Sequence, residues 1–133
     1  MNALTPRSPV ISRCRVLVVE DDAALGQALC RILAQAGYEA VFAGDFRAAL
    51  DVLEGEQAID LLLSDIVMPN GVNGLALARM ARLRRRDLKV IYLTGYNIPG
   101  VDEEALGPVL RKPVDDRVLI EQIERSLATK TEA

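Results

Sequence analysis

Five short apolar runs, separated by segments of helical periodicity, constrain the fold of this chain more than any other feature. The runs occupy residues 15–19, 38–43, 59–63, 89–93 and 108–110. The first, third and fourth are almost continuous in Val, Leu and Ile, which is typical of strands covered on both faces, and the mixed second run suits a sheet edge. Alternation of strands and helices with short connections predicts a doubly wound parallel sheet with right-handed crossovers.

Four of the intervening segments have the three- and four-residue spacing of amphipathic helices. The first ends at Gly37, and Asp45 is expected to cap the second. In the helix over residues 73–86 the predicted inward residues are Ala76, Leu77, Met80 and Leu83. In the helix after Pro113 they are Val118, Leu119, Ile123 and Leu127. Residues 95–107 contain a proline and three glycines, so the fourth helix is expected to be short or irregular.

Length and composition limit the class of protein. The 133 residues suffice for one domain, predicted over residues 14–128, with a disordered lead-in at 1–13 and a frayed end at 129–133. The net charge of -3 gives no reason to expect nucleic-acid binding, and the run at residues 84–86 is interpreted as a solvated basic helix end rather than a docking patch. No apolar stretch approaches the roughly 20 residues of a membrane span. With no signal peptide at the N-terminus, a cytoplasmic location is expected.

Chemically active side chains follow four of the predicted strands. The strand ends read Glu20-Asp21-Asp22, Ser64-Asp65, Thr94-Gly95 and Arg111-Lys112-Pro113. In an open doubly wound sheet, the site lies outside the carboxyl ends of the strands. Carboxylates crowded there repel one another unless a cation joins them, and a hard divalent ion such as Mg²⁺ fits oxygen ligands. Because the chain has no histidine, a histidine metal site, a histidine base and a phosphohistidine are excluded.

Together these groups suit phosphoryl transfer to a carboxylate. An ionised Asp65 can attack phosphorus, Lys112 can neutralise charge on the transferring oxygens, and Thr94 can donate its hydroxyl to one of them. Each group alone has a simpler interpretation: an aspartate after a strand is more often a helix cap, as expected for Asp22, and Lys-Pro or Thr-Gly is usually a loop or turn. Their joint occurrence at four strand ends favours the functional interpretation.

Four sequence blocks resemble the signature blocks of response-regulator receiver domains, namely VLVVEDD at 16–22, LLLSDIVMP at 61–69, VIYLTGY at 90–96 and VLRKP at 109–113. The resemblance implies a flavodoxin-like sheet of strand order 2-1-3-4-5, with Asp65 as the phosphoacceptor. It implies that Mg²⁺, with Mn²⁺ as an alternative, is held by Asp21, Asp65 and the Val67 carbonyl, with Glu20 acting through water. It further implies Thr94 as the switch hydroxyl, Lys112 as the phosphate partner and a cis Lys112–Pro113 bond.

Three departures from the family pattern stand out. The loop at residues 70–74 is one residue longer than the commonest form, which resembles receivers found with hybrid sensor kinases. Val109 occupies the usual position of the switch aromatic, so the ordinary coupling of that ring to Thr94 is not expected. Val67 and Tyr96 occupy positions that flank the route of the hydrolytic water in the family. Because neither is well placed to orient that water, a comparatively long-lived phosphoryl group is predicted.

The resemblance implies a signalling receiver that takes its phosphoryl group from a histidine kinase or a histidine phosphotransfer protein. It would then control a downstream protein of unknown identity, as a monomer or a weak phosphorylation-dependent dimer. It would not be an enzyme beyond catalysing its own phosphorylation and dephosphorylation. The alternatives are a receiver that only binds, without phosphorylation, and an Mg²⁺-dependent phosphatase with an aspartyl nucleophile. The sequence leaves open the kinase, the output partner and whether the domain stands alone.

Overall fold

A parallel sheet forms the centre of the computed structural model, which describes residues 13–67, 73–95 and 106–128. Its five strands lie in the order β2-β1-β3-β4-β5. Their bounds are Arg15–Val19 (β1), Glu39–Ala43 (β2), Leu61–Asp65 (β3), Lys89–Thr94 (β4) and Val109–Arg111 (β5). This order confirms the predicted flavodoxin-like fold.

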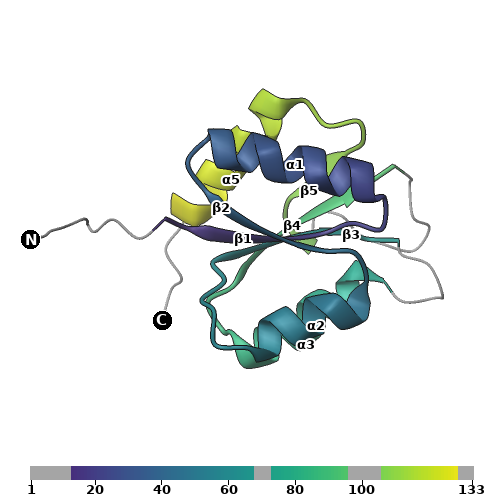
Figure 1. Ribbon diagram of the computed structural model, residues 1–133, viewed down its shortest axis with the longest axis vertical. Coiled ribbons are helices and arrows are strands. Elements are labelled where there is room, and N and C mark those ends of the chain that lie inside the picture. Colours follow the sequence, from purple (N-terminus) through teal and green to yellow (C-terminus); the bar gives the residue numbers. More distant parts are fainter. Residues whose placement is uncertain (1–12, 68–72, 96–105, 129–133) are drawn as a thin grey trace, which may run out of the picture.

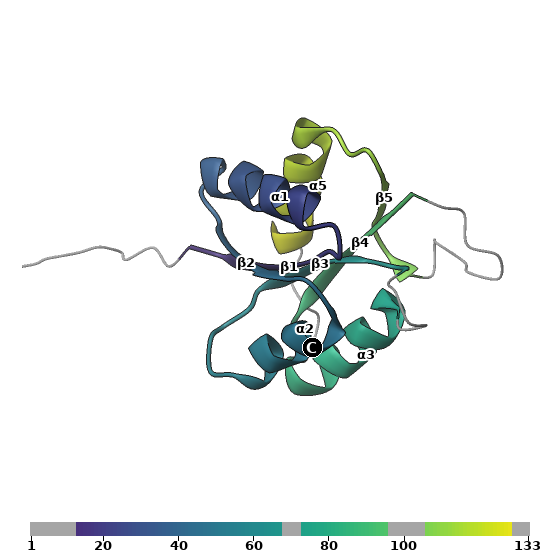
Figure 2. The ribbon, with the colours of Figure 1, turned by 45° about the vertical axis from the view of Figure 1, so that its right-hand side comes forward.

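Helices cover both faces of the sheet. The described helices are α1 (Ala23–Gln35), α2 (Phe46–Glu54), α3 (Gly74–Arg84) and α5 (Asp116–Ala128). Helices α1 and α5 lie on one face, and α2 and α3 lie on the other (Figures 1 and 2). The chain is therefore a three-layer α/β domain, in which all strands end at the same edge of the sheet.

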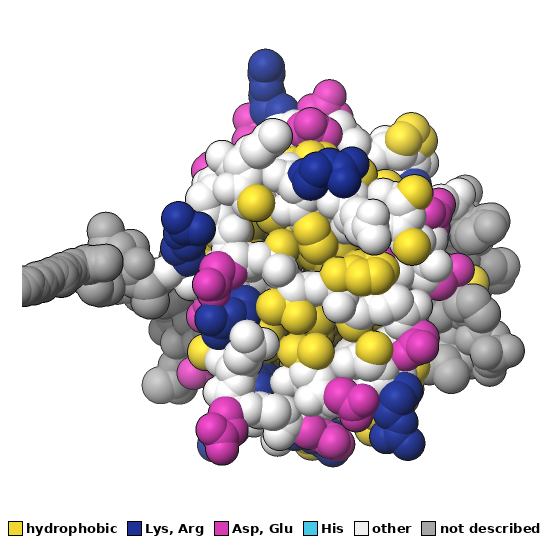
Figure 3. All heavy atoms as spheres, in the orientation of Figure 1, with side chains coloured by type: hydrophobic (Ala, Val, Ile, Leu, Met, Phe, Trp, Pro, Cys, Tyr) yellow, Lys and Arg dark blue, Asp and Glu magenta, His cyan; other side chains and the backbone are white. Residues whose placement is uncertain are grey.

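Strand alternation divides the core into two apolar clusters. Leu17 and Val19 of β1 belong to the cluster under α2 and α3, whereas Val16 and Val18 belong to the cluster under α1 and α5. Because successive side chains of a strand point to opposite faces, a strand buried on both faces needs the continuous apolar run seen in the sequence. The edge strand β2 is only half-buried, and apolar side chains gather over it between α1 and α2 (Figure 3).

Three side chains cap the helices that follow β1, β2 and β3. The carboxylates of Asp22 and Asp45 accept hydrogen bonds from the backbone nitrogens of Leu25 and Ala48 at 3.2 and 2.7 Å. The Asn73 side chain accepts one from Ala76 at 2.8 Å. Such bonds satisfy backbone donors that lack a partner in the first helical turn. The predicted caps at Asp22 and Asp45 are confirmed.

Some sequence expectations about elements are wrong in detail. Leu83 was predicted to face inward and is 79% exposed, and Val118 is 47% exposed. The third strand covers Leu61–Asp65 rather than residues 59–63. Ile59 is buried without pairing, while Ser64 and Asp65 pair with Tyr92 and Leu93. Burial produces the apolar run, but backbone pairing defines the strand, so the two need not coincide.

Several expectations lie outside the described residues. They are the disordered lead-in, most of the fourth helix, the loop insertion at residues 70–72, Tyr96 and the frayed C-terminus. Within the described part of the chain, no helix is both long and apolar enough to cross a membrane.

Candidate functional site

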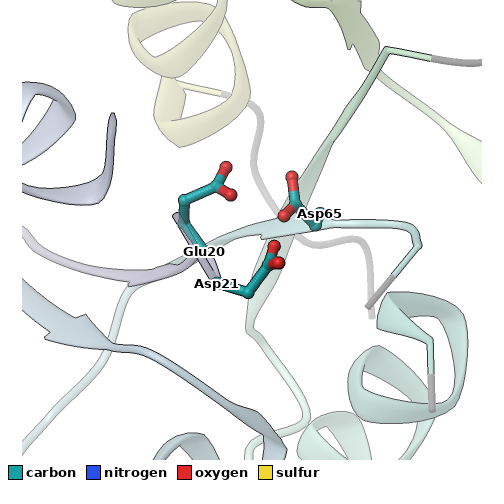
Figure 4. Close-up of side chains that lie close together, drawn as sticks. All are labelled: Glu20, Asp21 and Asp65. Carbon is teal, nitrogen blue, oxygen red and sulfur yellow. The ribbon is translucent and has the colours of Figure 1, made fainter. Parts of the chain in front are cut away.

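The carboxyl ends of four strands bring the predicted site residues to one edge of the sheet. Glu20 and Asp21 follow β1, and Asp65 is the last residue of β3. Figure 4 shows the three carboxylates pointing toward one another, and one oxygen from each lies within 4.8 Å of the others. The geometry places these three residues where the strand-end pattern predicted them.

Lys112, which follows β5, joins two of these carboxylates. Its Nζ lies 2.8 Å from Glu20 Oε1 and 2.5 Å from Asp65 Oδ1. The backbone nitrogen of Lys112 donates to the carbonyl oxygen of Thr94 at 2.9 Å, so the end of β5 is tied to the end of β4. Glu20, Asp65 and Thr94 are almost completely buried, with exposed fractions of 1%, 2% and 3%.

Burial and unbalanced charge set the protonation of the site. Loss of hydration raises the pKa of Asp65 to about 7; the ammonium of Lys112 acts against this rise, and Glu20 adds to it. Burial acts to lower the pKa of Lys112, but its contacts with Asp65 and Glu20 outweigh burial and hold that pKa above its usual value. The pKa of Asp65 and the pKa of Lys112 can both be raised because a single ammonium faces more than one carboxylate.

The donor set fits a divalent cation. When all groups are ionised, the three carboxylates and one ammonium carry an excess of two negative charges. Glu20 Oε1 and Asp65 Oδ1 are buried, and among the described residues the Lys112 ammonium is the only partner of either oxygen. Buried oxygens in this condition are costly unless a cation completes their coordination. This acidic cluster can therefore bind a metal ion through Glu20, Asp21 and Asp65.

Two further residues position Asp65, and the sequence interpretation gave neither of them a role. A Cβ at Gly74 would lie 1.9 Å from the backbone oxygen of Asp65, so only glycine lets α3 begin directly against the end of β3. The Gly74 nitrogen donates to the Ile66 oxygen at 2.7 Å, and Ser64 Oγ donates to the Asp65 oxygen at 2.9 Å. A glycine directly after the Asn73 helix cap is the sequence signal for this close approach.

The remaining predicted site residues lie nearby or outside the described chain. Val67 is 48% exposed and forms an isolated antiparallel bridge with Asn73. Val109 is half-buried and pairs with Tyr92 of β4. The Lys112–Pro113 peptide bond is cis, as the resemblance implied. Tyr96 is not among the described residues.

Comparison with known families decides the class of protein. The sequence model of the response regulator receiver domain matches residues 16–124, which is most of the chain. The chain belongs to the response regulator receiver domain family. It is therefore a receiver domain of the kind used in two-component signalling.

Individual relatives agree with this assignment. The response regulator receiver protein CpdR of Brucella abortus is 35% identical over 117 residues, which cover 85% of this chain and 96% of CpdR. The response regulator FleR of Pseudomonas aeruginosa is 37% identical, but the match covers 84% of this chain and only 24% of FleR. The crystal structure of the receiver domain of the hybrid histidine kinase CckA superposes with a TM-score of 0.70 at 35% identity, covering 85% of this chain and 98% of that one. Similar receivers therefore occur both nearly alone and as parts of longer proteins.

Proposed function

We propose that this domain acts in the cytoplasm, where Asp65 accepts a phosphoryl group from a histidine kinase or histidine phosphotransfer protein, and that phosphorylation switches the domain to control a partner. The observation that carries this proposal is the placement of Asp65. Its carboxylate is buried at the end of β3, in contact with the Lys112 ammonium and grouped with Glu20 and Asp21. A purely structural aspartate gains nothing from being buried beside two other carboxylates.

The chain's own residues supply most of the chemistry. An ionised Asp65 oxygen attacks phosphorus while the bond from phosphorus to the donor breaks, which gives an acyl phosphate and releases the donor group. Lys112, held by Glu20 and Asp65, stabilises negative charge on the phosphoryl oxygens. The hydroxyl of Thr94 donates to one of these oxygens after transfer. The buried setting limits access of bulk water to the acyl phosphate.

We assign Asp21, Asp65 and the Val67 carbonyl as ligands of Mg²⁺ or Mn²⁺, with Glu20 acting through water. When bound, the cation would neutralise charge on the attacking and transferring oxygens. The excess of two negative charges supports this assignment, as do the two buried carboxylate oxygens that share a single ammonium as their only partner among the described residues.

The apolar side chain of Val67 is proposed as a cause of a comparatively long lifetime of the phosphoryl group on Asp65. This side chain, two residues after Asp65, is half exposed and has no group that can orient an attacking water. Tyr96 is assigned to the same water route from its position in the sequence alone. A Val67→Asn variant is expected to lose the phosphoryl group faster than the wild type. Equal rates of autodephosphorylation would refute the assignment.

Phosphorylation by a small donor tests the main proposal. The chain is incubated with acetyl phosphate and Mg²⁺, and its intact mass is measured over time. One phosphoryl group is expected on the wild type and on Asp51→Asn, a control at an exposed aspartate of α2. No phosphoryl group is expected on Asp65→Asn or in the presence of a chelator.

The same experiment separates the alternative functions. An unmodified wild type, with no spectral response to beryllofluoride, would indicate a receiver that acts by binding alone. Sustained hydrolysis of an added phosphoester would indicate a phosphatase.

A further inference from the structure

A groove on the α3 side of the molecule lies away from the acidic cluster. It has a volume of about 400 Å³ and is formed by residues of α3 and β4 together with Leu106, three residues before β5. Leu75 and Leu106 contribute apolar surface, and the lining also includes Tyr92, Arg79, Arg82 and Leu83. Tyr92 is 3% exposed and belongs to the buried part of this lining, whereas Leu83 is 79% exposed.

Two arginines beside the groove have no carboxylate partner among the described residues. Helix α3 and the two residues after it carry five arginines and no acidic residue. Arg84 pairs with Glu54 at 3.0 Å, and Arg85 donates to the backbone oxygens of Leu53 and Gly55. These bonds hold α3 to the end of α2.

Arg79 and Arg82 have no such structural task. Both line the groove beside Tyr92, and their positive charges oppose the rise in the pKa of the Tyr92 hydroxyl that burial causes. Among the described residues that line the groove, two are cationic and none is acidic.

Charge and apolar exposure together define the chemistry of an occupant. Guanidinium groups pair with carboxylates in a planar, two-bonded geometry. A leucine exposed to this extent beside an apolar groove provides surface that an apolar side chain can cover. A short segment that carries both acidic and apolar side chains would complement the guanidinium groups and the exposed leucine.

We propose that this groove is a docking surface for an acidic segment of a partner protein. The segment inserts one apolar side chain against Tyr92, covers Leu83 and places carboxylates on Arg79 and Arg82.

Tyr92 connects the groove to the site of phosphorylation, a link that rests on the proposed function. It lies two residues before Thr94 on β4, so both side chains emerge from the same face of the sheet. Its partner in the neighbouring strand is Val109, at the position where an aromatic ring was expected from the family pattern. In this chain the aromatic ring near the switch threonine stands on β4 and contributes to the α3 groove. Movement of Thr94 upon phosphorylation therefore shifts the floor of the docking surface.

A peptide pair tests the groove directly. The probe is a labelled peptide in which one leucine is flanked by glutamates, and its control has every glutamate replaced by lysine. Binding to the full chain is measured by fluorescence anisotropy, and perturbation of the Leu83 and Leu106 methyl NMR signals locates the peptide. The acidic peptide alone is expected to bind, and the double variant Arg79→Gln/Arg82→Gln is expected to weaken it roughly tenfold.

The control is the double variant Arg31→Gln/Arg117→Gln, which removes equal charge from exposed positions on α1 and α5. Its affinity for the acidic peptide is expected to match the wild type. Equal binding of both peptides, equal affinity of both double variants or undisturbed Leu83 and Leu106 signals would overturn the proposal. Preferential binding of a DNA oligonucleotide, or self-association lost in Arg79→Gln/Arg82→Gln, would also overturn it by assigning the surface to another occupant.

Beryllofluoride distinguishes failure of this inference from failure of the proposed function. With the wild type it is expected to change the affinity of the acidic peptide, and with Asp65→Asn it is expected to have no effect. Peptide binding at the groove without any response to beryllofluoride would retain the docking surface and refute its coupling to Asp65.

Discussion

At the scale of single residues, Asp65 combines two properties that oppose each other in the metal-free protein. The proposed attack on phosphorus requires the ionised carboxylate, whereas burial favours the protonated form and raises the pKa of Asp65 from 3.8 to about 7. The folded chain thus retains a proton that the unfolded chain releases near pH 4. Since the unfolded state binds fewer protons in this interval, the free energy of unfolding falls as pH rises from about 4 to about 7.

Removing this carboxylate should remove the corresponding pH dependence. In the presence of a chelator, Asp65→Asn is expected to unfold at higher urea concentration than the wild type at pH 7 to 8. The difference should shrink toward pH 5, where the wild-type carboxyl is largely protonated. Asp51→Asn serves as the control and should follow the wild type. Parallel curves for Asp65→Asn and the wild type would contradict the assigned cause.

Sequence reasoning predicted that Glu20, Asp21, Asp65 and Lys112 lie together because these residues follow apolar strands, and the structure places them at one edge of the sheet. It did not assign the joint contact of Lys112 with Glu20 and Asp65, since that contact depends on side-chain conformation. It also missed the role of Gly74, because that role depends on the distance from Gly74 to a backbone atom of another element. Leu83 fits the helical period of α3, but this period cannot show where the elements packed against the helix end.

At the scale of elements, Gly74 determines how closely α3 approaches β3. In Gly74→Ala the new methyl group would collide with the Asp65 carbonyl, so the start of α3 must move and Asp65 with it. The expected cost is about 1–3 kcal/mol in the free energy of unfolding, together with slower phosphorylation by acetyl phosphate. Urea denaturation and timed intact-mass spectra measure the two effects.

Gly44→Ala is the matched control for this substitution, because its nearest neighbours would lie 3.7 Å away. It is expected to stay within about 0.5 kcal/mol of the wild type and to keep its phosphorylation rate. Similar behaviour of the two alanine variants would show that the close approach at Gly74 has no functional consequence.

The basic run after α3 contains a second matched pair. Arg85 donates three hydrogen bonds to the Leu53 and Gly55 carbonyls, whereas Arg86 is exposed. Arg85→Ala is therefore expected to lower the free energy of unfolding by about 1–2 kcal/mol, and Arg86→Ala by less than about 0.5 kcal/mol. Urea titration of both variants measures the difference. Equal losses would mean that the tether between α2 and α3 contributes nothing.

This pair also shows where sequence reasoning about elements reached its limit. The run at residues 84–86 was interpreted as a solvated helix end, which holds for the exposed Arg86 but not for the half-buried Arg85. The order and type of the described elements followed from periodicity and helix caps. Strand ends did not, because Ser64 and Asp65 extend β3 by backbone pairing that no apolar pattern marks.

At the scale of the whole molecule, the parallel sheet brings together residues that are far apart in the sequence. Glu20, Asp65 and Lys112 meet because β1, β3 and β5 end at one edge of the sheet. The α3 groove lies along the adjoining face, and Tyr92 belongs to a strand that also carries Thr94. The proposed phosphoryl acceptance and partner binding are thereby assigned to neighbouring parts of one sheet. The strand order was predictable from the family resemblance, whereas the groove required the positions of the side chains.

The central claim is that the phosphoryl group resides on Asp65, and borohydride trapping tests it most directly. The chain is phosphorylated with acetyl phosphate and Mg²⁺ and then reduced with borohydride, which converts an aspartyl phosphate to homoserine with release of phosphate. Peptide mass mapping should find homoserine at position 65 and nowhere else. Reduction at Asp21 or Glu20, or no reduction in a chain whose mass shows a phosphoryl group, would contradict the account.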